Sequence, residues 1–186
     1  MNVQPPLQMD QQAFLAWVQG RKEHYELDRG RVIMMTGGSR AHSQITMNFL
    51  KALDARLDPV RFAVLPKFAI DTGPQTIRFP DIVVDVAGEK PGDLKATAPM
   101  LIVEVLSPSS DRIDLGDKAA EYVRIPSLSA YLVVAQDEMK AWLWVRGATG
   151  FAPGADVLKG DEAVIHIEPL RIDLPFAEVY DRVRMT

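Results

Sequence analysis

Two apolar stretches, FPDIVV at residues 79–84 and LIVEVLSP at residues 101–108, decide how this chain should fold. Both contain a run of branched aliphatic residues, which is typical of a buried strand. The first stretch carries Asp81 and the second carries Glu104. A charge at the end of a buried strand is costly unless an opposite charge pairs with it. Two such carboxylates on consecutive strands therefore predict a shared cation.

The flanking segments predict a mixed α/β (α+β) fold. Residues 9–19 and 41–57 have the apolar spacing of amphipathic helices, and residues 25–35 favour a β-hairpin around the turn at 28–30. We expect further strands at residues 61–65, 68–71, 77–86, 100–106, 130–135, 141–145 and 163–167, and further helices at residues 115–124 and 176–183. A surface turn is expected at residues 107–110. Because strands that are apolar throughout need cover on both faces, we predict one central mixed sheet flanked by helices.

Length and composition are those of one globular domain spanning residues 1–186. The sequence has no cysteine, which excludes disulfides and thiolate metal sites. It also has no P-loop, dinucleotide-binding or Gly-x-Ser-x-Gly motif, and its histidines lack the spacing of a metal pair. The N-terminal residues do not resemble a signal peptide, and no apolar run is long enough to span a membrane. We therefore expect a cytoplasmic protein.

The charge distribution leaves two interpretations open. A net charge of −4 argues against non-specific nucleic-acid binding, although a bound metal ion would cancel part of it. Several cations nonetheless gather near the start of the chain, at Arg21, Lys22, Arg29, Arg31 and Arg40. They form either a solvated hairpin surface or an edge that contacts phosphates.

The two carboxylates have the chemistry that phosphodiester hydrolysis requires. A divalent ion makes water nucleophilic and stabilises the negative charge that develops during the reaction. Magnesium prefers oxygen ligands and keeps several waters, so Asp81 and Glu104 would suffice as its protein ligands. The helix expected after Glu104 carries Lys118, whose ammonium could orient the water or stabilise the transition state.

An ordered set of motifs along the chain resembles a known group of proteins. The motifs are Tyr25-Glu26-Leu27, Gly30, His42, Pro80-Asp81, the sequence EVLSPS at residues 104–109, Lys118 and Tyr122. From about residue 25 to residue 145, the chain resembles a large bacterial family of proposed restriction endonucleases within the PD-(D/E)XK nuclease superfamily.

This resemblance implies a restriction-endonuclease-like core and a nuclease that cleaves DNA with Mg²⁺, for which Mn²⁺ is a possible substitute. It also implies a homodimer, because cutting both strands of a duplex needs two sites. The alternative is a non-catalytic nucleic-acid-binding or assembly protein that keeps the fold. The two functions differ in where Lys118 should point: toward the Asp81–Glu104 pair in a nuclease, and toward solvent otherwise.

Two departures from the superfamily pattern shift the expected site residues. The superfamily places its lysine two residues after the second acid, where this chain has Leu106, so the resemblance points to Lys118 on the following helix. The superfamily often has a glutamate on its first helix, but residues 41–57 contain none. His42 and Glu26 are the available substitutes, with a helix-start hydrogen bond and an exposed hairpin position as their structural alternatives.

The three main candidates have structural alternatives as well. Asp81 could cap a turn before its strand, and Glu104 could form a buried salt bridge without any metal. Lys118 could be a solvated helix residue paired with Asp114 or Glu121, because residues three or four apart are neighbours on a helix.

Overall fold

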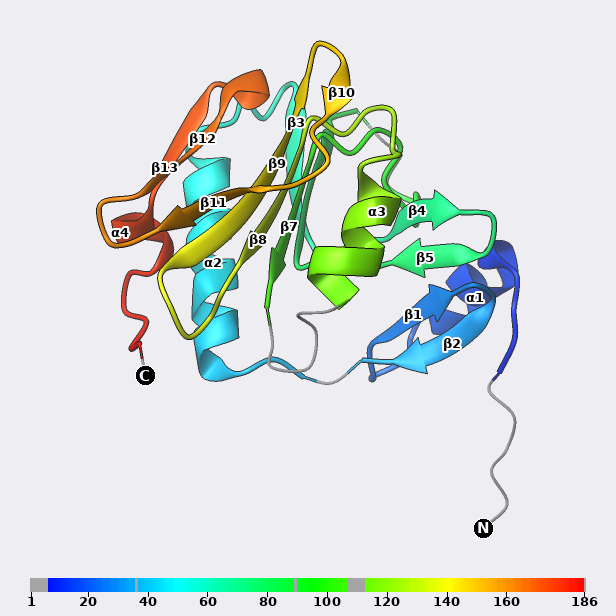
Figure 1. Cartoon of the computed structure of the whole chain (residues 1–186). Coiled ribbons are helices and arrows are strands. Elements are labelled where there is room, and N and C mark those ends of the chain that lie inside the picture. The colour runs from blue at the N-terminus through cyan, green and yellow to red at the C-terminus, as the bar shows by residue number, and fades with distance from the viewer. Residues whose placement is uncertain (1–6, 36, 89, 107–112, 186) are drawn as a thin grey trace.

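The computed structural model describes residues 7–35, 37–88, 90–106 and 113–185. Within these residues a seven-stranded sheet forms the centre of the molecule, with helices on both faces (Figure 1). Its strands in spatial order are β10 (Gly150–Phe151), β9 (Lys140–Gly147), β8 (Ala130–Val134), β7 (Leu101–Val105), β6 (Ile82–Val86) and β3 (Phe62–Pro66), and β11 (Asp156–Lys159) also pairs with β9. The predicted mixed sheet is thus confirmed.

The pairing in this sheet explains the position of the first covering helix. β3, β6 and β7 form an antiparallel meander, whereas β7 and β8 run parallel. Parallel neighbours need a crossover connection, which a helix usually provides. Here a π-helical turn, η1 (Ile113–Lys118), leads directly into the short helix α3 (Ala119–Tyr122). The expected turn at 107–110 lies outside the described residues.

Helix α2 (Arg40–Asp54) covers the opposite face of the sheet (Figure 1). Ser39 caps it by accepting a hydrogen bond from the His42 backbone N–H at 3.1 Å, and one face buries Ile45, Phe49 and Leu53. The last part of the chain packs beside α2 as β12 (Val164–Ile167), η2 (Glu168–Leu170), β13 (Ile172–Pro175) and α4 (Phe176–Val179).

A second sheet lies at the end of the molecule where α3 packs (Figure 1). Its strand order is β2 (Arg31–Met34), β1 (Tyr25–Asp28), β5 (Thr76–Arg78) and β4 (Ile70–Gly73). Helix α1 (Gln11–Val18) begins at the capping residue Asp10 and buries Phe14 against Leu27 and Ile77. The N-terminal helix and hairpin predicted from the sequence are both present.

Two expectations about the strands are wrong. Residues 77–86 form two strands rather than one, and β5 and β6 belong to different sheets, so a single sheet is also wrong. Pro80 lies between them and has no N–H to continue a ladder. The break carries the chain from the small sheet to the large one and places Asp81 directly before β6.

The two helices predicted in the C-terminal half of the chain begin or end at other residues than predicted. The helix expected at residues 115–124 begins earlier and ends at Tyr122, and the helix expected at 176–183 ends at Val179. Throughout the described part of the chain, no helix combines the length and apolar character that a membrane crossing requires.

Candidate active site

Asp81 and Glu104 meet on one face of the central sheet. The antiparallel ladder ends at the pair of Ile82 with Val103, and Asp81 and Glu104 lie one position beyond this pair, where opposed residues share a face. The Asp81 N–H approaches Glu104 Oε2 at 3.4 Å, and the Val105 N–H donates to Asp81 Oδ2 at 2.7 Å. Both side chains are buried.

Lys118 points at Glu104 of this pair and not at solvent. Its Nζ donates to Glu104 Oε1 at 2.9 Å, and the Tyr122 hydroxyl donates to the same oxygen at 3.0 Å. Only 4% of Lys118 is exposed, so its interpretation as a solvated helix residue is wrong. The π-helical turn brings Asp114 to the same ammonium, with Oδ1 3.1 Å from Nζ.

Asp114 contributes an acidic group that the sequence suggested only as a surface partner of Lys118. It is buried, and its Oδ1 has no hydrogen-bond partner within the described residues, because Lys118 approaches as an ion pair only. Its partner at this oxygen is thus the Lys118 ammonium, which it shares with Glu104.

Glu26 reaches the same cluster from β1 of the small sheet. Its Oε1 accepts the Phe79 N–H at 3.1 Å and lies 3.6 Å from Lys118 Nζ, and its Oε2 lies 3.3 Å from an Arg78 nitrogen. Glu26 is buried, so the exposed hairpin position is wrong for it. It connects β1 with the Phe79 backbone, just before Asp81, and with Lys118.

Two cationic or basic groups approach Asp81 from outside the acidic cluster. His42, near the start of α2, places Nε2 3.1 Å from Asp81 Oδ2, in addition to its backbone bond to the helix cap. Lys67 places Nζ 2.5 Å from Asp81 Oδ1. Sequence reasoning missed Lys67, because it lies in the turn after β3 with a positive φ of 50° that nothing in a lysine predicts.

These residues line a cavity of about 670 Å³ between the small sheet and the start of α2. Its walls also include apolar side chains and the exposed Arg21. Three buried carboxylates surround the ammonium of Lys118, those of Glu26, Glu104 and Asp114, and Asp81 lies beside Glu104. The donors are hard oxygens, which suits magnesium.

A magnesium site of two carboxylates and several waters fits these residues better than a site enclosed by protein ligands. Among the residues described, no group of three or more His, Cys, Asp or Glu side chains is arranged to hold a metal. Magnesium needs only one or two carboxylates, whereas structural zinc sites need four protein ligands.

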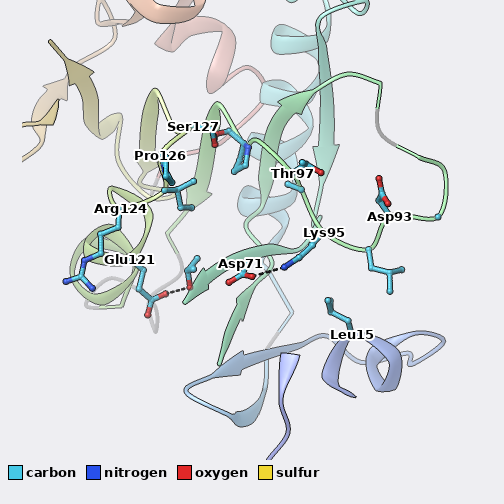
Figure 2. A pocket seen from close by; sticks show the side chains of 15 residues that line it. Leu15, Asp71, Asp93, Lys95, Thr97, Glu121, Arg124, Pro126 and Ser127 are labelled. Carbon is cyan, nitrogen blue, oxygen red and sulfur yellow. Dashed lines mark hydrogen bonds and ion pairs between the residues drawn. The ribbon is translucent and has the colours of Figure 1, made fainter. Parts of the chain in front are cut away.

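A second cavity, of about 790 Å³, lies between α1, β4 and the end of α3 (Figure 2). Two of its carboxylates are paired with side chains, and Asp93 is partly exposed. Asp71 binds Lys95 at 2.7 Å, and Glu121 accepts hydrogen bonds from Thr72 and Arg78. The first cavity, where the buried carboxylates of Asp81, Glu104 and Asp114 gather with the buried Lys118, is therefore the candidate active site.

Comparison with known proteins shows the family of this chain. A family model described as "Uma2: Putative restriction endonuclease" matches residues 11–176. The chain belongs to the Uma2 family. The resemblance noted in the sequence is thereby confirmed, and all of the candidate residues lie inside the matched range.

Two relatives of this Uma2 chain come from Synechocystis sp. The uncharacterized protein slr1290 is 31% identical over 145 residues, which are 74% of each chain. The uncharacterized protein sll1609 is 29% identical over 122 residues, 61% of this chain and 67% of the relative. The crystal structure of "a putative nuclease belonging to DUF820" from Anabaena variabilis superimposes with a TM-score of 0.77. It covers 95% of this chain and 99% of its own at 14% identity, which confirms the fold.

In the Uma2 site, the pKa values of the two main acids, Asp81 and Glu104, are shifted in opposite directions. Burial alone would raise the pKa of Asp81, but its hydrogen bond with His42 and the charge of Lys67 outweigh burial and hold the pKa at about 2. Asp81 is therefore ionised at neutral pH.

Glu104 is shifted in the opposite direction. Burial raises the pKa of Glu104 to about 8, helped by the charges of Asp114, Asp81 and Glu26 and opposed by Lys118. Burial alone would lower the pKa of Lys118, but the surrounding carboxylates raise it above its usual value. The ammonium stays charged, and Glu104 is the group whose ionisation a bound cation would favour.

We expect the metal-free protein to lose stability as the pH rises from about 4.5 to about 8. A folded-state pKa of about 8 for Glu104, above the ordinary 4.5, means that the folded protein binds this proton more tightly than the unfolded chain does. Asp81 acts in a lower window, because its stabilising effect is lost only as the pH falls from about 4 toward 2. Thermal unfolding between pH 4.5 and 8.5, with chelator present, measures the effect.

The control is Glu104→Gln, whose melting temperature should vary less with pH over this range. Adding Mg²⁺ should stabilise the parent more at pH 8 than at pH 5. A parent melting curve that shifts upward between pH 5 and pH 8 without metal would contradict the assignment.

The buried Arg78 should be the most important cation for stability. It contacts Glu26 at 3.3 Å, Asp28 at 3.0 Å and Glu121 at 2.8 Å. Removing one member of a buried ionic network leaves charges unpaired at a cost of roughly 3–5 kcal/mol. We expect Arg78→Met to lower the free energy of unfolding by about this amount in urea denaturation.

A matched control is Arg56→Met. Arg56 pairs with Glu178 at 2.6 Å, but both side chains are about one third exposed. Such a surface pair contributes roughly 0–1 kcal/mol. Equal losses in the two variants would show that burial does not decide the contribution of Arg78.

Proposed function

We propose that this protein is an endonuclease that hydrolyses phosphodiester bonds of DNA with the help of a divalent metal ion. The observation that carries the proposal is the buried ammonium of Lys118, held 2.9 Å from Glu104 at the base of a cavity that also contains Asp81. Two acids and a lysine facing one cavity are a nuclease arrangement, and membership of a family described as restriction endonucleases supports it.

Asp81 and Glu104 would hold Mg²⁺, or Mn²⁺ as a substitute. When bound, the metal would polarise the phosphate and lower the pKa of a coordinated water. Asp81 is prepared for this role because it is already ionised and is held through Oδ2 by His42 and the Val105 N–H.

Lys118 would stabilise the charge that develops on the phosphate or orient the attacking water. A fixed charge in a site shielded from water is worth more than the same charge in solution. Its position is fixed by contacts with Glu104, Asp114 and Glu26, at 2.9, 3.1 and 3.6 Å. Tyr122 supports the arrangement, because its hydroxyl donates a hydrogen bond to the same Glu104 oxygen that Lys118 contacts.

The nucleic acid would approach from the side of the small sheet. Arg21 lines the cavity and stacks over Trp17, with its guanidinium carbon 3.9 Å from the ring centroid. Like Arg21, the remaining cations singled out in the sequence are exposed: Lys22, Arg29, Arg31 and Arg40. Phosphate neutralisation by such side chains would supply sequence-independent affinity despite the negative net charge.

A cleavage assay on purified protein tests the proposal. The substrates are supercoiled plasmid, a linear duplex, single-stranded DNA and single-stranded RNA, each with Mg²⁺, Mn²⁺ or chelator. We expect metal-dependent cleavage of DNA by the parent and none by Asp81→Asn. Binding of DNA without cleavage under all conditions would favour the non-catalytic alternative. A homodimer and a cytoplasmic location stay predictions.

A further inference from the structure

Lys67 contacts Asp81 and Lys118 contacts Glu104, but the two side chains are held in different ways. Lys118 is buried among three carboxylates. The Lys67 side chain is 48% exposed and makes one ion pair with a described residue, to Asp81 Oδ1 at 2.5 Å. An ammonium with its outer half in solvent can leave its partner at little cost, whereas a buried one cannot.

The backbone of Lys67 is fixed, so its side chain is directed at Asp81. Lys67 follows Pro66 at the end of β3 and adopts a left-handed conformation with φ of 50°. Its N–H donates to the Asp81 carbonyl oxygen at 3.2 Å. A left-handed residue that is not glycine costs free energy, and such strain persists where the surrounding structure requires it.

The two oxygens of Asp81 have different partners. Oδ2 accepts the Val105 N–H and contacts His42, both of which are anchored in the sheet and the helix. Within the described residues, Oδ1 contacts the Lys67 ammonium. Oδ1 is therefore the oxygen whose present partner is a half-exposed cation.

We propose that Lys67 is a positioning residue that acts as an exchangeable counterion of Asp81. The inference rests on the proposed metal-dependent function. Before metal binds, the ammonium neutralises Asp81 and helps to keep it ionised and oriented beside Glu104. A divalent ion takes over this position on Oδ1, and the Lys67 side chain moves into solvent at the rim of the cavity.

Competition between the two cations has a measurable consequence. Neutral variants at position 67 should bind divalent metal more tightly than the parent, because the ion no longer displaces an ammonium. An ion pair whose ammonium is half exposed is weak, so the metal displaces it at a small cost. Removing this cost should raise the affinity for the metal by roughly fivefold. A residue with a purely structural role at position 67 would not raise metal affinity.

The experiment is a calorimetric titration of chelator-treated protein with Mg²⁺, and then with Mn²⁺, at pH 8 without nucleic acid. We compare the parent with Lys67→Met, Lys67→Gln and Lys67→Arg. The two neutral variants should bind metal about fivefold more tightly, and Lys67→Arg should remain close to the parent. Two neutral variants are used so that a folding defect in one does not decide the result.

The matched control is Lys95→Met. Lys95 is another partly exposed lysine that pairs with an aspartate, Asp71, at 2.7 Å, and Figure 2 shows this pair in the second cavity. Its removal should leave metal affinity unchanged. This control separates a local exchange at Asp81 from the general effect of removing one positive charge.

Each outcome decides the inference. Tighter metal binding by both neutral variants, with Lys67→Arg and Lys95→Met like the parent, supports it. Equal or weaker binding by the neutral variants overturns it but leaves the proposed nuclease intact. A parent that binds neither Mg²⁺ nor Mn²⁺ overturns both this inference and the metal site of the proposed function.

Discussion

Replacing Glu104 with glutamine is expected to abolish metal-dependent cleavage of DNA while the fold remains intact. The amide keeps the shape of the side chain but removes a negative charge from the proposed metal site. Burial and neighbouring carboxylates disfavour the charged form of Glu104, so the metal-free variant should be at least as stable as the parent at pH 8. Cleavage of a plasmid substrate and thermal unfolding, measured on the same preparations, test both statements.

The control for this variant is Glu138→Gln. Glu138 is an exposed acid that pairs with Lys140 at 3.0 Å, so the same chemical change should leave cleavage unaffected. Cleavage by Glu104→Gln at the parent rate would remove Glu104 from the site.

Lys118→Ala should slow cleavage by a factor of roughly 10²–10³, the usual loss for one electrostatic stabiliser of a transition state. Binding of magnesium and of DNA should persist, because an ammonium is not a ligand for a hard cation. The rate is measured at saturating Mg²⁺ and pH 8, and metal affinity is measured separately by calorimetry.

Lys118→Arg should restore little activity. The planar guanidinium cannot reproduce a compact point charge in the space between Glu104 and Asp114. Lys95→Ala serves as the control for the loss of a lysine elsewhere. If Lys118→Ala cleaves at the parent rate, then Lys118 has only a structural role and His42 becomes the next candidate.

The fold was largely predictable because its strands are strongly apolar and its hairpin and helices carry clear local signals. Asp10 and Ser39 cap α1 and α2, and the LIVEV stretch forms a central strand. The division into two sheets was missed because residues 77–86 are apolar on both sides of Pro80. Which sheet each half joins depends on distant pairing, such as that of Leu27 with Ile77.

The site was predictable where chemistry and strand position coincided. Asp81 and Glu104 are charges on apolar strands, and such charges require a partner. Lys67 and Asp114 were not predicted as site residues, because their places in the site depend on the conformation of the backbone. Lys67 contacts Asp81 from a turn with a left-handed conformation, and Asp114 is buried in the π-helical turn η1, where it pairs with Lys118. Neither conformation follows from the identity of the residue.

The most direct test of the shared cation site is a pair of crystal structures of the protein with Mn²⁺ and with Mg²⁺. Manganese scatters anomalously, so its position can be determined independently of the protein density. We predict one anomalous peak between the carboxylates of Asp81 and Glu104, and magnesium–oxygen distances of roughly 2.0–2.1 Å in the matching crystals. No peak at this position in fully loaded crystals, or a peak bound only by other residues, would contradict the account.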